Sequence, residues 1–142
     1  MVAGRSSLVA SERKPRGYRD LDVYQRAMDV LVDVHRLAAR LPSVERYELA
    51  SQLRRASKPI PANIAEGYAK RRSAKEFISF LTTALGSANE MEVHLEIAER
   101  LGYIPADEVA GLREAYEIIG RQLAALIGSW QAPRTPPATS DQ

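Results

Sequence analysis

Apolar residues recur every three or four positions through four segments of this chain, and no segment shows the strict alternation of a β-strand. In the first segment, about residues 21–41, two neighbouring stripes repeat in this way. The first stripe is Leu21, Tyr24, Met28, Leu31, His35 and Ala38, and the second is Val23, Ala27, Val30, Val34, Leu37 and Leu41. One seam of a helical bundle needs only one stripe, so the pair predicts either a broad core contact or self-association.

The second segment, about residues 43–68, keeps its helical spacing across two prolines. The apolar positions on either side of them are Leu53, Ala56, Ile60 and Ile64. A proline removes a backbone donor and clashes with the preceding turn, at a cost of about 3 kcal/mol in a helix interior. The pattern therefore predicts one helix that bends near Pro59–Pro61. Ser43 is the expected N-cap of this helix, and Asn63 is the expected cap of the portion beyond the bend.

The third segment begins with Ser73 and Glu76, which have the spacing of a capping box, and Gly102 marks its end. Gly86 lies inside this helix among other small residues, where glycine costs about 1 kcal/mol relative to alanine. We therefore expect the close approach of another helix at Gly86, either from within the bundle or from a second subunit.

The fourth segment begins near Pro105, and its apolar positions alternate three and four residues apart to Trp130 without a miss. Four helices of roughly 20 to 30 residues, joined by short loops, predict an all-α fold. The expected architecture is an antiparallel up-down-up-down four-helix bundle over residues 20–130.

The two ends of the chain lack helical periodicity. Residues 1–19 are rich in Ser, Gly and Arg and predict a flexible basic arm, whereas residues 131–142 are rich in Pro, Thr and Ser and predict a disordered tail. The absence of cysteine excludes disulfides, thiolate zinc sites and cysteine nucleophiles. No apolar run approaches the roughly 18 residues of a membrane span, and the N-terminus lacks the apolar block of a secretory signal. We therefore expect a cytoplasmic protein with no membrane partner.

The net charge of +2 conceals a segregation of charge along the chain. Residues 1–19 carry five Lys/Arg against one acid, residues 46–75 carry eight against two, and residues 90–117 carry two against eight. In an up-down bundle the start of the first helix meets the junction of the second and third helices. The basic candidates at that end are Arg13, Lys14, Arg16 and Arg19, facing Lys70, Arg71, Arg72 and Lys75. We expect Glu96, Glu99, Asp107 and Glu108 at the opposite end.

Three further basic residues, Arg54, Arg55 and Lys58, are expected to point outward along the second helix. Together with the residues above they form the candidate nucleic-acid-binding set, because phosphate backbones attract such clusters through counterion release without reading sequence. The competing interpretation is a solvated surface that only aids solubility.

Neither histidine predicts a catalytic or metal site. His35 lies on an apolar stripe, which is typical of a hydrogen-bonded core or interface histidine. His94 follows Glu90 by four residues and could form one edge of a metal site, but this spacing occurs once, and di-metal bundles use paired Glu-x-x-His motifs. Asn63 and Glu66 have the spacing of helix caps, and no phosphate-binding glycine loop is present. We expect no enzymatic activity, no metal and no cofactor.

Several motifs along residues 19–130 occur together in one known family. They are Leu41-Pro42, Glu45, Leu49, Gln52-Leu53-Arg54-Arg55-Ala56, Ile60-Pro61-Ala62-Asn63-Ile64-Ala65-Glu66-Gly67, Phe77, Leu85-Gly86-Ser87, Glu90 and Leu101-Gly102-Tyr103. With these residues the chain resembles the bacterial four-helix-bundle proteins first noticed as open reading frames inside intervening sequences of 23S ribosomal RNA genes. Pro59 departs from the family pattern, in which a small polar residue is expected.

The resemblance implies a left-twisted antiparallel bundle that assembles into a ring-like homopentamer with no known enzymatic activity. In a related branch, the accessory proteins of diversity-generating retroelements, a basic surface binds nucleic acid and a reverse transcriptase. The leading hypothesis is a non-enzymatic oligomeric bundle that binds RNA or DNA electrostatically, together with a protein partner. The alternative is a structural or protein-docking scaffold, such as a reverse-transcriptase accessory subunit, without direct nucleic-acid binding.

Overall fold

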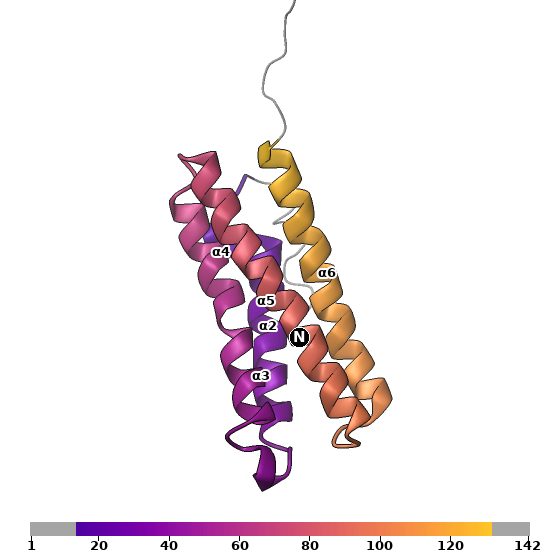
Figure 1. Ribbon diagram of the computed structural model, residues 1–142. Coiled ribbons are helices and arrows are strands. Elements are labelled where there is room, and N and C mark those ends of the chain that lie inside the picture. The colour runs from indigo at the N-terminus through magenta and orange to yellow at the C-terminus, as the bar shows by residue number, and fades with distance from the viewer. Residues whose placement is uncertain (1–13, 132–142) are drawn as a thin grey trace, which may run out of the picture.

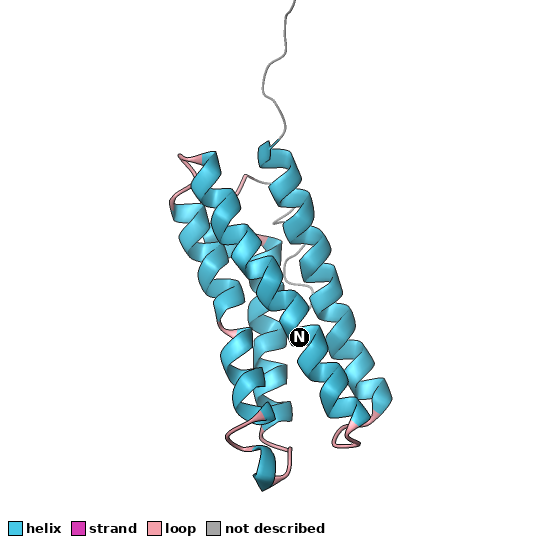
Figure 2. Ribbon diagram, viewed as in Figure 1, coloured by secondary structure: helices cyan, strands magenta, loops and turns pink. Residues whose placement is uncertain are grey.

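The computed structural model describes residues 14–131, and over this range the chain forms a four-helix bundle without a strand (Figures 1 and 2). The elements in chain order are η1 (Tyr18–Asp20), α2 (Asp22–Ala38), η2 (Ser43–Glu45), α3 (Leu49–Ser57), α4 (Pro59–Ala69), α5 (Ala74–Arg100) and α6 (Ala106–Gln131). α3 and α4 together make the second rod of the bundle. Residues 1–13 of the expected arm, which include Arg13, lie outside the described residues. Residues 132–142 of the expected tail also lie outside them.

Contacts between distant segments set the directions of the rods. The hydroxyl of Tyr68, near the end of α4, donates to the carbonyl of Pro15, just before η1, at 3.4 Å. Phe77 near the start of α5 packs edge-to-face on Trp130 near the end of α6, with ring centroids 4.9 Å apart. Arg40, just after α2, forms an ion pair with Glu108 in the first turn of α6. Each contact joins the start of one rod to the end of another, so neighbouring rods run antiparallel, as predicted (Figure 1).

The core is drawn from every rod. The largest fully buried side chains are Val34 and Leu37 of α2, Leu53 of α3, Ile60 and Ile64 of α4, Phe77, Leu81, Met91 and Leu95 of α5, and Tyr116, Ile119 and Leu123 of α6. Burying one such side chain stabilises a fold by about 1.5–3 kcal/mol relative to leaving it in water. This shared core holds the ends of the rods in fixed positions, and the ends carry the charged surfaces.

α2 uses only one of its two apolar stripes as the core seam. The second stripe is buried, from Val23 through Val34 to Leu37. The first stripe is half-buried for most of its length, and Met28 is 37% exposed. Val32, next to this stripe, is 43% exposed. A broad core contact therefore does not account for the first stripe, part of which remains on the surface.

The predicted bend in the second rod lies at Lys58, between α3 and α4. Pro59 and Pro61 have no amide hydrogen, so two helical hydrogen bonds are missing there. Lys58 itself keeps helical angles, with φ −72° and ψ −36°, so the rod bends without unwinding. The expected capping role of Asn63 is wrong. α4 already begins at Pro59, because proline suits a first helical turn, and the Asn63 amide donates back to the Pro59 carbonyl at 2.7 Å.

The start of the second rod also differs from the prediction, since Ser43 makes no side-chain cap. Residues 43–45 form the short helix η2, and α3 begins only at Leu49. Glu48 occupies the N-cap position of α3, and the nearby Glu45 accepts the Leu49 amide at 3.2 Å through one carboxylate oxygen and the Tyr103 hydroxyl at 2.8 Å through the other. This carboxylate therefore ties the α2–α3 corner to the α5–α6 loop.

Both ends of α5 follow the sequence pattern. The Ser73 hydroxyl accepts the amide of Glu76 at 3.1 Å, which is the serine half of the expected capping box. Gly102 has φ +78°, and its amide donates to Glu99 while the Tyr103 amide donates to Ala98. These two bonds form a Schellman motif, whose left-handed residue favours glycine.

The tight approach between helices occurs at Gly67. A Cβ at Gly67 would lie 2.7 Å from the Phe80 Cβ and 3.1 Å from the Phe77 ring. A Cβ at Gly86 would meet nothing within 4 Å, so the expected close approach from within the bundle is wrong at that position. The other expectation for Gly86, an approach from a second subunit, stays a prediction.

Candidate nucleic-acid interface

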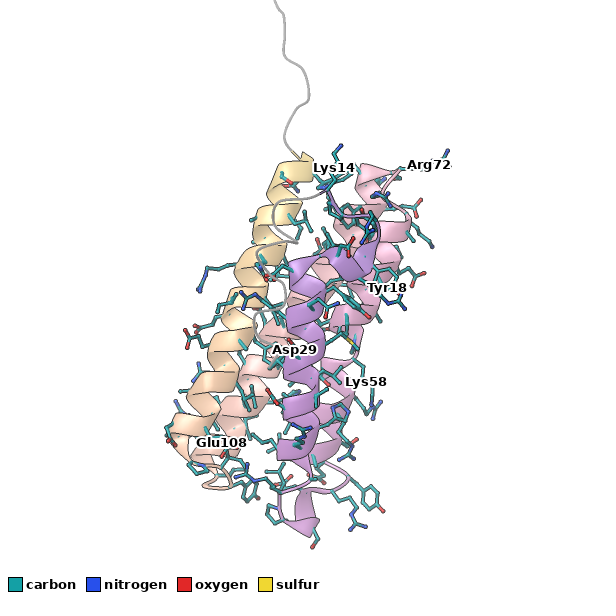
Figure 3. All side chains as sticks on the ribbon, turned by 180° about the vertical axis from the view of Figure 1, so that it is seen from behind. Lys14, Tyr18, Asp29, Lys58, Arg72 and Glu108 are labelled. Atoms are coloured by element: carbon teal, nitrogen blue, oxygen red, sulfur yellow. The ribbon has the colours of Figure 1, made fainter. Side chains whose placement is uncertain are left out.

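Two basic segments that are distant in the sequence meet at one end of the bundle. We define the basic end as residues 14–20 and 66–76, which the hydrogen bond from Tyr68 to Pro15 joins. Its basic side chains are Lys14, Arg16, Arg19, Lys70, Arg71, Arg72 and Lys75. Its acidic side chains are Asp20, Glu66 and Glu76. Figure 3 shows Lys14 and Arg72 at this same end, with Tyr18 further down the bundle. The structure thus brings together the candidates predicted there, apart from Arg13, which is not among the described residues.

Tyrosine side chains pack against the segments that form the basic end. The Tyr68 ring packs edge-to-face on Phe77, with centroids 6.2 Å apart, and its hydroxyl holds Pro15. Tyr18 of η1 packs edge-to-face on Tyr24 of α2 at 5.0 Å. These aromatic contacts fix the segment before α2 against the end of α4. Tyr18 and Tyr68 were not among the residues predicted for the site, although each has an arginine nearby in the chain.

The local partners of the basic side chains leave most of their charge available. Arg16 pairs with Asp20 at 3.4 Å and Lys70 with Glu66 at 3.5 Å, both on the surface. Exposed pairs of this kind contribute about 0–1 kcal/mol, so a phosphate can replace the carboxylate at little cost. Within residues 14–131, Arg72 has no carboxylate within salt-bridge distance. The basic end therefore carries an excess of accessible positive charge.

Two arginines of the basic end lie over tyrosine rings. The Arg71 guanidinium carbon is 3.9 Å from the centroid of the Tyr68 ring, and its Nη1 donates to the Tyr68 carbonyl at 2.8 Å. The Arg19 guanidinium carbon lies 4.9 Å from the Tyr18 ring centroid. Cation–π contacts of this kind contribute about 0.5–1 kcal/mol at exposed sites and favour one orientation of an otherwise flexible side chain.

The three candidates on the second rod do not belong to the basic end. Arg54 and Arg55 lie on α3, and Lys58 lies at the bend, well below Lys14 and Arg72 in Figure 3. A guanidinium nitrogen of Arg54 donates to the Arg46 carbonyl at 3.3 Å. The candidate set thus divides into a group at one end of the bundle and a smaller group along its side.

The opposite end is not purely acidic. Glu108 pairs with Arg40, and this hydrogen bond lowers the pKa of the Glu108 carboxyl. Glu96 pairs with Arg100 at 2.8 Å. The acidic residues that the sequence places at this end therefore share it with Arg40, just after α2, and Arg100 of α5, and the charge there is mixed.

The histidines have local hydrogen-bond partners. His35 Nδ1 lies 2.9 Å from the Leu31 carbonyl oxygen, and the buried His94 places its Nε2 3.0 Å from a carboxylate oxygen of Glu90. Among the described residues, no three His, Asp or Glu side chains cluster closely enough to hold a metal ion. No helix of the described part has the length and apolarity needed to cross a membrane.

A second notable surface is an open groove of about 440 Å³ between α3 and the end of α5, with a mixed polar and apolar lining, which we name the Tyr47 groove. It is lined by Glu45, Tyr47, Glu48, Leu49, Ser51, Gln52, Arg55, Ile97 and Leu101. Tyr47 is 83% exposed and Leu101 is 55% exposed, and Val93 on the same helix is 55% exposed. Exposed apolar groups gathered in this way are typical of a protein-binding surface.

Taken together, the helices and the charged end define the class: a small all-α, four-helix-bundle protein with one basic end. Residues 19–125 match the 23S rRNA-intervening sequence proteins, and the chain belongs to that family, as its motifs predicted. A crystal structure of a protein of unknown function from the S23 ribosomal protein family of Bacteroides thetaiotaomicron is similar, with a TM-score of 0.68 and 27% identity. That similarity covers 75% of this chain and 95% of the other. No curated protein matches the sequence.

Proposed function

We propose that this protein is a non-enzymatic, homo-oligomeric bundle that binds nucleic acid electrostatically through its basic end. One observation carries the proposal: the basic end contains seven Lys/Arg side chains and only three acidic ones. They come from two segments that the Tyr68–Pro15 hydrogen bond joins across 53 positions of the chain. Phosphates that bind such a cluster release condensed counterions, which favours binding without base-specific contacts. The family name refers to ribosomal RNA genes, so a structured RNA is the first ligand to test.

The test is a binding titration at several salt concentrations with a variant in which Lys70, Arg71 and Arg72 are replaced by alanine. If all three contact phosphates, the slope of log K against log salt should fall by about 2 to 3. The matched control replaces Arg36, Arg46 and Arg100, which removes the same charge from the opposite end. We expect the control to bind like the unmodified protein. Equal weakening by both variants, or by neither, would contradict the proposal.

We further propose that the subunits form a ring-like homopentamer. Met28 in the first stripe of α2 and the neighbouring Val32 support self-association, because both are exposed and the core of the subunit does not use them. Five basic ends in one particle would raise a weak affinity through avidity. Light scattering should give about five times the subunit mass of 15.7 kDa. The double variant Met28→Glu, Val32→Glu should lower that mass, and a single-subunit mass for the unmodified protein would refute the assembly.

The second candidate function is a protein-docking scaffold, for example an accessory subunit of a reverse transcriptase, without direct nucleic-acid binding. The Tyr47 groove favours it, because Tyr47, Ile97 and Leu101 expose apolar area beside the acidic Glu45 and Glu48. A partner that stays bound after nuclease treatment, and is lost in Tyr47→Ala, Leu101→Ala protein, would support this function. Binding that disappears with nuclease would instead favour nucleic-acid contact.

A further inference from the structure

The basic end contains a guanidinium plane that is held in place before any ligand binds. Arg71 is fixed twice, by the Tyr68 ring 3.9 Å from its guanidinium carbon and by the hydrogen bond to the Tyr68 carbonyl at 2.8 Å. Tyr68 is itself held by the Phe77 ring and by Pro15. Arg71 is also an exposed residue, so its guanidinium group can be reached from solvent. The result is a flat, positively charged surface of defined orientation.

A second arginine–tyrosine pair comes from the other segment of the basic end. Arg19 lies over the Tyr18 ring at 4.9 Å, and Tyr24 braces that ring at 5.0 Å. η1, which carries this pair, packs against α4, which carries Tyr68. Two such pairs therefore stand at the same end of the bundle.

We propose that the basic end binds unpaired bases as well as phosphates, so its ligand is a single-stranded or looped nucleic acid rather than a continuous duplex. The inference rests on the proposed function. The electrostatic attraction of phosphate depends on charge, which a lysine supplies without a plane. A base, in contrast, stacks on an arginine or aromatic plane, and each stacked base raises affinity roughly 5- to 100-fold. Inside a duplex the base faces are already stacked on their neighbours and are not accessible.

Pre-ordering of the plane strengthens this assignment. An arginine loses much rotamer freedom when it binds, and a side chain already held on a ring loses less. Arg72, one residue further on, has the same charge but no aromatic ring among the cation–π contacts of the described residues. Comparing substitutions of Arg71 and Arg72 therefore distinguishes the effect of the oriented guanidinium plane from the effect of the charge.

The experiment measures fluorescence anisotropy with a labelled oligonucleotide of about 12 nucleotides, alone and annealed to its complement. The unmodified protein should bind the single strand at least about 5-fold more tightly than the duplex. Arg71→Lys keeps the charge and loses one of the two planes, so it should lower that preference while the duplex affinity and the salt slope stay the same. Arg72→Lys is the matched control and should keep the preference.

Three outcomes distinguish the possibilities. Binding to neither strand form would refute the proposed function itself. Equal binding to both forms, or equal effects of Arg71→Lys and Arg72→Lys, would overturn the stacking proposal alone and leave electrostatic binding intact. Tyr68→Phe keeps the ring and removes the hydrogen bond to Pro15, so it should preserve the preference. A loss of preference in Tyr68→Phe would show that the pair only anchors the preceding segment, and it would also overturn the stacking proposal.

Discussion

Replacing Gly67 by alanine should destabilise the bundle even though alanine is the better helix former. Gly67 lies in α4 where that helix meets α5 most closely. The new Cβ would stand 2.7 Å from the Cβ of Phe80, an atom attached directly to the α5 backbone. A rotation of the Phe80 side chain cannot relieve this contact, so one helix must move away from the other.

The magnitude follows from two opposing terms. Overpacking of a core costs about 1–3 kcal/mol, and a contact between two Cβ atoms belongs in the upper half of that range. The gain from replacing glycine in a helix is about 1 kcal/mol. We therefore expect Gly67→Ala to lower the free energy of unfolding by about 1–2 kcal/mol, a fall in Tm of roughly 3–10 °C for a domain of this size.

Urea unfolding followed by circular dichroism provides the assay, with Gly111→Ala as the matched control. Gly111 lies inside α6, and a Cβ there would meet nothing within 4 Å. Gly111→Ala should therefore raise the free energy of unfolding by about 0.5–1 kcal/mol. The two substitutions should have opposite signs. If Gly67→Ala were as stable as the unmodified protein, α4 and α5 would not pack as described.

Three more predictions concern stability. Tyr116→Phe should add about 1 kcal/mol, because the buried Tyr116 hydroxyl finds no hydrogen-bond partner among the described residues. Ser73→Ala should cost about 1 kcal/mol through loss of a helix cap. Burial raises the pKa of Asp22, but hydrogen bonds from Gln122 and Arg26 outweigh burial and lower it overall. The stabilisation from the ionised Asp22 is therefore complete above its unfolded pKa and is lost as pH falls through its folded pKa. Asp22→Asn should reduce the dependence of unfolding free energy on pH below about pH 4. An unchanged pH profile would contradict this.

The sequence predicts the rods of this fold well because each rod depends on local rules. The spacing of apolar residues from Val109 to Trp130 leaves no alternative to a helix, and Gly102 ends α5 through its own backbone angle. The prolines predict the bend for the same local reason. The choice of α2 stripe could not be predicted, because both stripes are apolar and the rotation of α2 is set by the rods that pack on it.

For the helix caps and the candidate site, too, local features could be predicted and contacts between distant residues could not. Glu45 rather than Ser43 accepts the first amide of α3, and its second carboxylate oxygen accepts from Tyr103, 58 residues away, a bond that no local pattern contains. The convergence of basic residues follows from topology alone and could be predicted. The position of Arg71 over Tyr68 depends on side-chain conformation, and the only signal in the sequence is their separation of three residues across the end of α4.

The most direct test of nucleic-acid binding at the basic end is a crosslinking map. A short single-stranded RNA containing a photoreactive base is irradiated with the oligomeric protein, and the modified peptides are identified by mass spectrometry. Binding at the basic end predicts crosslinks concentrated in residues 14–20 and 66–76. Crosslinks concentrated on α3 or in the Tyr47 groove, or spread evenly over the surface, would contradict it.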